Sequence, residues 1–206
     1  MALRDYSDLN ELQLDALKEI GNIGSGNAAT ALSDMLERSV SIAVPTIKVL
    51  DYNTVVQNLG GPETLLVGIL LCLNGDITGM MMFLLHKEFA HMVLNSLIGS
   101  EFNEEVDLDD MSQSTIQEVG NIMGASYVNA IASLTGLKID ISVPNMSVDM
   151  AGALLSVPAI YYANISDKII LIEDEFGHET KESTSHILLI PEVDSLQKIM
   201  ESLGLD

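Results

Sequence analysis

The stretch that decides the fold occurs twice in this chain. Residues 15–23 read Asp-Ala-Leu-Lys-Glu-Ile-Gly-Asn-Ile, and residues 114–122 read Ser-Thr-Ile-Gln-Glu-Val-Gly-Asn-Ile, a shift of 99 positions. The correspondence continues without a gap to the Val-Pro pairs at residues 44–45 and 143–144. Self-similarity of this kind indicates a duplication, which predicts a pseudo-symmetric fold.

Each copy begins with a helical pattern and continues with a strand pattern. Residues 10–37 and 111–134 place apolar residues at spacings of three and four, which predicts a helix in each copy. Residues 40–44 and 139–143 alternate with period two and are followed by proline, which predicts a strand closed by that proline. Both halves therefore start with a helix and then a strand.

Further along, each half has a predicted pair of strands. Leu65–Leu73 and Ile77–Leu85 flank Asn74-Gly75-Asp76, where Asn-Gly supplies the positive φ angles of a tight hairpin turn. The counterparts in the second half are Lys168–Ile172 and Ile187–Ile190. The polar residues 173–185 between them predict a long, exposed hairpin loop.

The halves end alike and are joined by acidic residues. Amphipathic stretches at 90–99 and 196–204 close the two repeats, which we expect at about 9–99 and 111–205, with an acidic linker at 100–110. The prediction is one domain over residues 1–206 of the α/β class (α+β type). It is a pseudo-two-fold duplicated domain with a mainly antiparallel sheet and helices against it.

Composition limits the function. The 206 residues include 30 Asp and Glu against 9 Lys and Arg, a net charge of −21, and 48% are hydrophobic, enough to form a core. Because such an acidic surface repels phosphate backbones and anionic lipids, we expect neither nucleic acid nor a membrane as partner. With no long apolar run and no targeting pattern, the expected location is cytoplasmic. The single cysteine, Cys72, excludes an intrachain disulfide.

Three polar positions recur on the repeated helix at spacings i, i+4 and i+7, which fall within about 60° of each other on one helix face. One such trio is ordinarily a solvated helix face, but its retention in both copies favours a functional role. The positions are Asp15, Glu19 and Asn22 in the first copy and Ser114, Glu118 and Asn121 in the second.

Glycines flank both trios, and each mid-helix glycine costs about 1 kcal/mol relative to alanine. This cost is tolerable where the missing side chain allows a close approach, either by the other helix or by a partner protein. The glycines are Gly21, Gly24, Gly26, Gly120 and Gly124.

The chain lacks the residues of common hydrolytic mechanisms. It has no Ser-His-Asp order, Cys-His pair, zinc-binding HExxH motif or P-loop, and its histidines (His86, His91, His178 and His186) are not spaced for a metal. An Asn amide can orient a water and a carboxylate can pair with a partner's cation. An amide and a carboxylate can promote hydrolysis only if the phosphoryl group is already labile and the phosphorylated protein itself supplies Mg²⁺ and Lys. An aspartyl phosphate fits this description.

The doubled Asp/Ser-x3-Glu-x2-Asn pattern, each copy followed by a strand and Val-Pro, resembles the CheC family of chemotaxis phosphatases, which is related to CheX and to the flagellar switch phosphatase FliY. The resemblance extends over residues 9–205. In length the chain is more similar to the CheC proteins than to FliY, which carries an additional domain. The resemblance implies that the two motif helices lie side by side on one surface.

The resemblance also implies roles for the motif residues. Asn22 and Asn121 each enter the active site of phosphorylated CheY and orient the attacking water, and Glu19 and Glu118 each contact the active-site Lys of CheY. Asp15 and Ser114 occupy the supporting first position. No cofactor or metal of its own is expected, since Mg²⁺ is supplied in the active site of the response regulator.

CheC-like proteins also pair with the receptor deamidase CheD, and Asp149, in the segment 147–152, fits the docking residue of the family. Alternatively, Asp149 is a helix N-terminal acid that satisfies backbone amides. Two functions stay open: a phosphatase regulated by CheD, or a non-catalytic adaptor that binds phosphorylated CheY or CheD. A duplicated domain satisfies its symmetry internally, so we expect a monomer.

Overall fold

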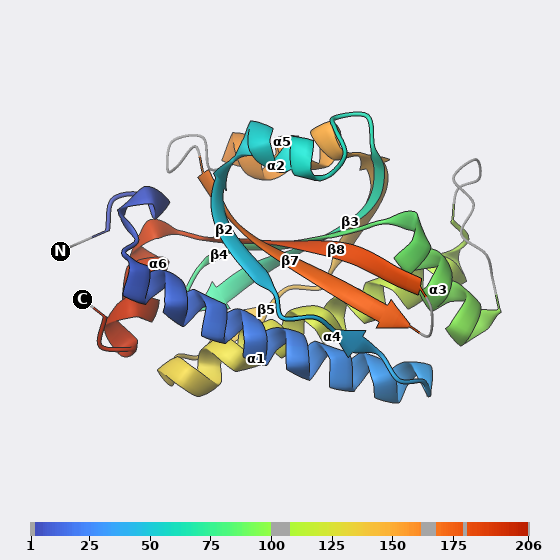
Figure 1. Ribbon diagram of the computed structural model, residues 1–206, viewed down its shortest axis with the longest axis horizontal. Coiled ribbons are helices and arrows are strands. Elements are labelled where there is room, and N and C mark those ends of the chain that lie inside the picture. The colour runs from blue at the N-terminus through green and yellow to red at the C-terminus, as the bar shows by residue number, and fades with distance from the viewer. Residues whose placement is uncertain (1–2, 100–107, 162–167, 179–180, 206) are drawn as a thin grey trace.

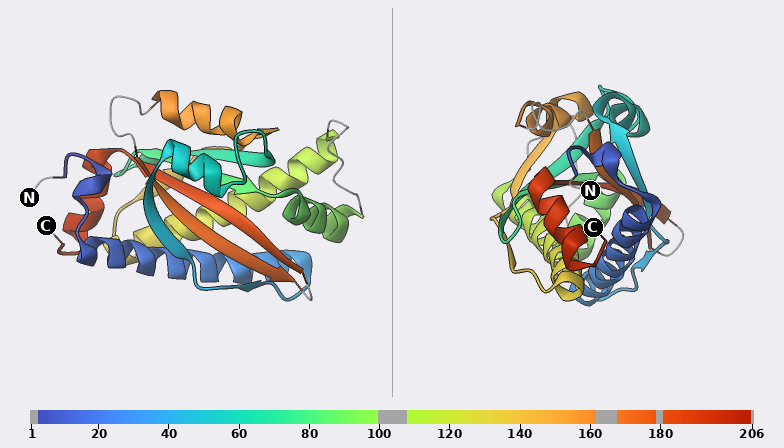
Figure 2. Two further views of the ribbon diagram at one scale, coloured as in Figure 1. Left: turned by 45° about the horizontal axis from the view of Figure 1, so that its top comes forward. Right: turned by 90° about the vertical axis from the view of Figure 1, so that its left-hand side faces the viewer.

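The computed structural model describes residues 3–99, 108–161, 168–178 and 181–205 (Figure 1). An antiparallel sheet lies between two layers of helices. The long helices α1 (Glu11–Leu36) and α4 (Asp110–Thr135) lie next to each other under one face and run in opposite directions (Figures 1 and 2). This confirms the predicted fold class, including the two motif helices side by side on one surface.

Local signals fix where the two long helices begin and end. Asn10 and Gln13 form a capping box before α1, and the Asp109 carboxylate accepts a hydrogen bond from the Ser112 N–H before α4. Hydrogen bonds from the Ser112 side chain and from its N–H lower the pKa of Asp109. Gly136 ends α4 in the left-handed conformation that glycine favours (φ 73°). The predicted helices over 10–37 and 111–134 are confirmed.

The sheet has eight strands, and every pairing between the described strands is antiparallel. The strand order is β1-β7-β8-β4-β3-β5, with β2 also pairing with β7 and β6 with β3. The strands are β1 (Ser41–Ile42), β2 (Thr46–Asp51), β3 (Leu65–Gly75), β4 (Gly79–Leu85), β5 (Ile139–Ile141), β6 (Asn145–Met150), β7 (Lys168–His178) and β8 (Lys181–Pro191).

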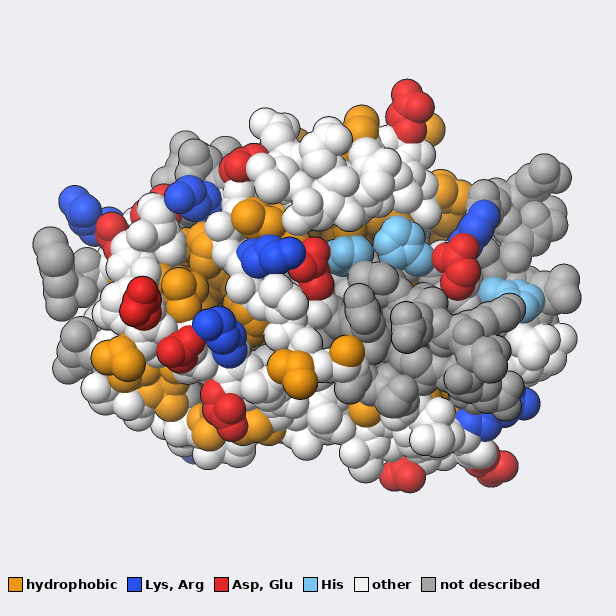
Figure 3. Space-filling model, viewed as in Figure 1, with side chains coloured by type: hydrophobic (Ala, Val, Ile, Leu, Met, Phe, Trp, Pro, Cys, Tyr) orange, Lys and Arg blue, Asp and Glu red, His pale blue; other side chains and the backbone are white. Residues whose placement is uncertain are grey.

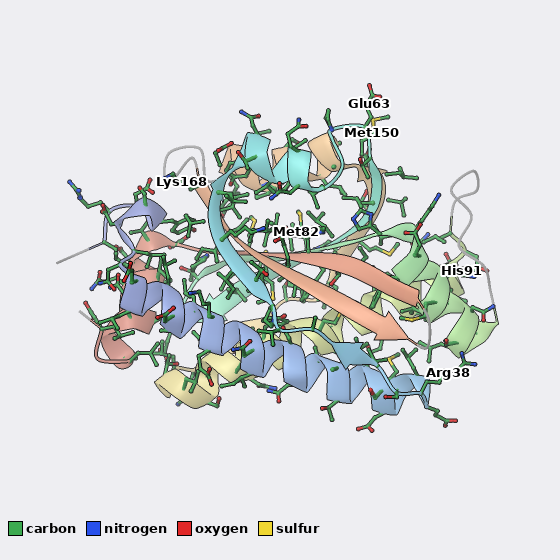
Figure 4. All side chains as sticks on the ribbon, viewed as in Figure 1. Arg38, Glu63, Met82, His91, Met150 and Lys168 are labelled. Atoms are coloured by element: carbon green, nitrogen blue, oxygen red, sulfur yellow. The ribbon has the colours of Figure 1, made fainter. Side chains whose placement is uncertain are left out.

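The strand pairing crosses between the two halves of the chain. β2 pairs with β7, placing Ile47 opposite Ile172, and β6 pairs with β3, placing Met146 opposite Ile69. The two hairpins β3–β4 and β7–β8 meet in the centre, where β4 pairs with β8. Every residue of β4 is buried, and Figure 4 shows Met82 in the middle of the sheet. Each half thus supplies edge strands to the hairpin of the other.

Two of the strand predictions were wrong in their ends. The strands expected over 40–44 and 139–143 shrink to β1 and β5, and longer strands, β2 and β6, follow the prolines at 45 and 144. Proline has no N–H to donate to the ladder, so it interrupts the pairing there. The ladder resumes after it, because β7 and β3 continue as partners.

The prediction of an exposed loop over residues 173–185 was also wrong. β7 and β8 stay paired through this segment as far as His178 opposite Lys181, and residues 179–180 lie outside the described residues. β1 pairs with the same part of β7. A polar sequence forms a strand here because its backbone finds ladder partners on both sides.

The remaining helices cover the sheet elsewhere. α2 (Tyr52–Asn58) and α5 (Ala151–Tyr161) lie over the face opposite α1 and α4, at the top of Figure 1. The sequence did not predict α2, and it indicated a helix after Asp149 only through the alternative interpretation of that residue. α3 (Lys87–Ile98) and α6 (Val193–Ser202) confirm the amphipathic stretches at the ends of the two halves. In the described part of the chain, no helix is long and apolar enough to cross a membrane. The acidic linker predicted at 100–110 lies outside the described residues up to residue 107.

Candidate functional site

The two motifs lie on the outer face of the α1–α4 layer. Glu19, Asn22 and Glu118 are exposed, and Asn121 is half-buried. Within the described residues, no hydrogen bond or ion pair engages any of these four side chains. A carboxylate and an amide one helical turn apart are therefore presented to solvent twice.

The first motif position differs between the copies. Asp15 accepts a hydrogen bond from Lys18 Nζ at 2.7 Å, and both side chains are more than half exposed. The equivalent position in α4 is the neutral, exposed Ser114, with Gln117 at the place of Lys18. Only the first copy thus carries an ion pair beside its Glu.

The two motifs are separate sites. The Ser25 and Tyr127 hydroxyls are 2.6 Å apart, which marks where α1 and α4 lie opposite each other. Because the helices are antiparallel, Asn22 and Asn121 lie on opposite sides of this contact. From the rise per residue and a typical helix spacing, their backbones are about 15 Å apart.

The space beside the motif glycines is occupied by the protein's own side chains. A Cβ on Gly24 would lie 2.6 Å from the Tyr127 ring, and a Cβ on Gly120 would lie 2.6 Å from the Ile69 side chain of β3. Gly26, in contrast, is exposed and has no atom within 4 Å of such a Cβ. The close approach therefore comes from the opposite helix and the sheet, the first of the two interpretations of these glycines.

Tyr127 is a residue that the sequence did not single out. Its ring packs against Gly24 and edge-on to Phe83 of β4, with ring centroids 6.3 Å apart. Its hydroxyl and that of Ser25 hydrogen-bond beneath α1. The repeat comparison contained the signal, because Gly24 stands where the second copy has Met123.

Asp149 lies at the end of β6, on the other side of the molecule from the motifs. Its carboxylate is exposed and accepts a hydrogen bond from the Met150 N–H at 2.7 Å. The first amides of α5 have other partners, since Ala151 N–H donates to Thr64 O and Gly152 N–H to Pro62 O. Asp149 therefore satisfies the amide just before α5, as the alternative interpretation expects, but not the amides of Ala151 and Gly152.

A polar cluster lies on the sheet face opposite the motif helices. Lys48 forms an ion pair with Glu173, and His186 Nε2 lies 3.9 Å from Glu173 Oε1. The His86 and His186 rings meet edge-on, with centroids 5.7 Å apart. Figure 3 shows basic, acidic and histidine side chains adjoining below α2. Among the described residues, no three His, Cys, Asp or Glu are arranged to hold a metal ion.

Burial dominates the electrostatics of these histidines. Loss of water and, to a smaller extent, the neighbouring His86 lower the pKa of His186 to about 4, against the opposing effect of Glu173. Burial also lowers the pKa of His86. Both rings are therefore neutral at pH 7, and they lie on the sheet face away from the motifs.

Comparison with known proteins places this arrangement in a family. The CheC-like family matches by sequence at residues 12–49 and 111–148, one segment around each motif. The CheY-P phosphatase CheC of Bacillus subtilis (strain 168) is 34% identical over 203 residues, which covers 97% of this chain and 97% of that protein. The chain belongs to the CheC-like family.

Two further proteins are similar. The flagellar motor switch phosphatase FliY of Bacillus subtilis (strain 168) is 28% identical over 145 residues, which covers 70% of this chain and 38% of that protein. The crystal structure of Thermotoga maritima FliY has a TM-score of 0.74 at 24% identity, covering 95% of this chain and 98% of that one. The latter likeness supports the fold.

Proposed function

We propose that this chain hydrolyses the aspartyl phosphate of phosphorylated CheY, and that both copies of the motif are active sites. The observation that carries the proposal is the solvent-facing Glu and Asn, one turn apart and unengaged within the described structure, in both helices. The 34% identity to a protein named CheY-P phosphatase supports the choice of substrate.

The chemistry divides between the two proteins. The phosphorylated regulator brings a labile phosphoryl group together with its own Mg²⁺ and Lys. The amide oxygen of Asn22 or Asn121 accepts a hydrogen bond from a water and aims the water's lone pair at phosphorus. As the water oxygen bonds to phosphorus, the bond from phosphorus to the aspartyl oxygen breaks, and the aspartate leaves as a carboxylate. The products are inorganic phosphate and unmodified CheY.

The motif carboxylates hold the regulator in place. Glu19 and Glu118 contact the active-site Lys of CheY, which explains why each is left without a cation of its own chain in the described structure. Asp15 is already paired with Lys18, so it and Ser114 support the helix rather than contact phosphate. No group of this chain has to bind a metal for this mechanism.

The test is the decay of radiolabelled phospho-CheY in the presence of Mg²⁺. Wild type is expected to accelerate the decay, and an Asn22→Ala/Asn121→Ala variant is expected to leave it at the regulator's own rate while still binding the regulator. The matched control is Asn53→Ala/Asn58→Ala, which removes two exposed amides from α2 on the opposite face and should keep full activity. If wild type leaves the decay unchanged with and without CheD, the chain is an adaptor.

The same chain offers a place for a second partner. Exposed apolar side chains follow the exposed Asp149 at the end of β6 and along α5: Met150, Val157, Ile160 and Tyr161. Figure 4 shows Met150 projecting at the edge of the molecule farthest from α1 and α4. This surface supports docking of the deamidase CheD at Asp149, remote from both motifs. An Asp149→Lys variant should lose CheD binding and keep its phosphatase rate, and equal loss of both would contradict separate surfaces.

A further inference from the structure

Two pairs of exposed apolar side chains occupy equivalent places in the two copies. Leu12 and Met111 expose 67% and 63% of their surface, and Val44 and Val143 expose 82% each. Both pairs are related by the shift of 99 positions that relates the motifs. A single exposed apolar residue is ordinary, but the same exposure at two positions in both copies is not.

Leu12 and Met111 belong to the motif face of their helices. Leu12 stands three residues before Asp15, so the positions 12, 15, 19 and 22 form one stripe within about 80° of the helix circumference. Leu12 lies about 15 Å along the helix from Asn22. Each motif stripe therefore begins with a large apolar side chain in the first turn of its helix.

Val44 and Val143 lie beside the other end of each stripe. Pro45 packs against Gly21, the neighbour of Asn22, since a Cβ on that glycine would lie 3.7 Å from the proline ring. The second loop is fixed to the sheet by Ser142, whose N–H donates to Cys72 O at 3.0 Å and whose hydroxyl accepts from Cys72 N–H at 3.0 Å. Ile141, two residues before Val143, packs against Gly124, three residues after Asn121, since a Cβ on that glycine would lie 3.6 Å from the Ile141 side chain.

The other exposed large apolar residues of the described chain lie elsewhere. Four belong to the end of β6 and to α5, and the remaining two, Ile98 and Leu134, stand at the ends of α3 and α4 and are little more than one third exposed. On the motif side, the four repeated residues are thus the main apolar surface, and they bracket the unengaged Glu and Asn of each copy.

We propose that Leu12 with Val44, and Met111 with Val143, are the apolar contacts that seat the phosphorylated response regulator over each motif; this rests on the proposed function. The exposed carboxylate between each pair has no cation within the described structure, so it fits a partner that presents one beside its phosphoryl group. Apolar contacts around a polar centre exclude bulk water from it, which strengthens the Glu–Lys contact and keeps the oriented water in place.

The test isolates one copy at a time. In an Asn121→Ala background, where only the first copy works, Leu12→Ser and Val44→Ser should each raise the phospho-CheY concentration for half-maximal rate about tenfold, with little change in the maximal rate. Met111→Ser and Val143→Ser should have no effect in this background. In an Asn22→Ala background, where only the second copy works, Met111→Ser and Val143→Ser should raise this concentration. Leu12→Ser and Val44→Ser should then have no effect.

The matched control is Gln57→Ser, which removes an exposed side chain from α2, on the face opposite both motifs. The proposal is overturned if the Leu12 and Val44 variants behave like this control, or if they lower the maximal rate alone. It is also overturned if wild type self-associates in sedimentation and these substitutions abolish the association, because the surface would then pair copies of this chain. Absence of any acceleration by wild type would instead refute the proposed function.

Discussion

The two halves of this molecule agree on one side of the sheet and differ on the other. On the α1–α4 side, Glu and Asn stand at equivalent positions with apolar neighbours of equal exposure. On the opposite face, the first edge carries the charged cluster of Lys48, Glu173 and His186. The equivalent positions at the second edge are Ser147, Leu70 and Met82, since Leu70 pairs with Met82 as Glu173 does with His186. The two copies thus share the exposed residues on the motif side and differ in the residues on the opposite face of the sheet.

The helices over this face differ as well. α2 has seven residues and ends in the polar Gln57 and Asn58, whereas α5 has eleven and exposes Val157 and Ile160. The chain therefore carries two copies of the proposed catalytic surface and one copy of the proposed deamidase-docking surface. On this proposal, one bound CheD would leave both motifs open to the regulator.

The largest effect is expected when the two proposed catalytic motifs are inactivated one at a time and then together. Because the motifs share no residue and lie about 15 Å apart, the accelerations retained by Asn22→Ala and by Asn121→Ala should add up to that of wild type. Removing the second amide from either variant should then lower the acceleration by at least about a hundredfold. Initial rates of phospho-CheY decay measure both, and a single variant already at the regulator's own rate would contradict independent sites.

The charged cluster predicts a difference in acid stability. His186 has a pKa of about 4 in the folded protein and near its ordinary 6.5 when unfolded, so between these values the unfolded state binds the proton preferentially. The free energy of unfolding should therefore fall by about 2–3 kcal/mol as the pH drops from 7 to 4.5. His186→Met, the residue at the equivalent position, removes this contribution.

Urea unfolding of wild type and His186→Met at both pH values measures the difference, because the other titrating groups are common to the two proteins. Equal pH dependence in the two would show that the imidazole is not held neutral by the fold. His86, Lys48, Glu88 and Glu173 are the charged or titratable groups that act on the two histidines, and the substitution leaves them in place.

A smaller effect is expected at the glycines that distinguish α1 from α4. Gly24→Ala should lower the free energy of unfolding by about 2 kcal/mol, because its Cβ meets a Tyr127 ring held by Phe83 and Ser25. Gly26→Ala, two residues away and open to solvent, should raise it by up to about 1 kcal/mol. Denaturant midpoints give both values, and a neutral Gly24→Ala would mean that Tyr127 moves freely.

The smallest effect concerns the ion pair that only the first copy has. Lys18→Gln introduces the residue found at the equivalent position of α4 and removes the exposed pair with Asp15. The free energy of unfolding should fall by about 0.3–0.5 kcal/mol at low salt. The difference from wild type should vanish in 1 M salt, and its persistence there would point to packing by the lysine stem instead.

Local patterns in the sequence predicted the long helices and the hairpin cores because their apolar periods extend over many residues. β2 and β6 were not predicted because a proline after an alternating stretch ordinarily marks the end of a strand. In the structure, pairing resumes after each proline, since β2 pairs with β7 and β6 pairs with β3. The extent of α5 was not predicted because this helix is apolar all round and has no helical stripe. The motif residues were found through the repeat, but no local pattern shows that Asn121 is half-buried while Asn22 is exposed.

The exchange of edge strands between the halves has a consequence for how the chain folds during synthesis. Lys48 in β2 meets Glu173 in β7, a partner 125 residues later in the sequence. A nascent chain that has emerged only as far as α3 holds β3 and β4 but lacks the neighbours that cover β2 and complete its sheet. Contacts this distant in sequence slow folding, and the first half cannot complete its sheet until the second half has been synthesised.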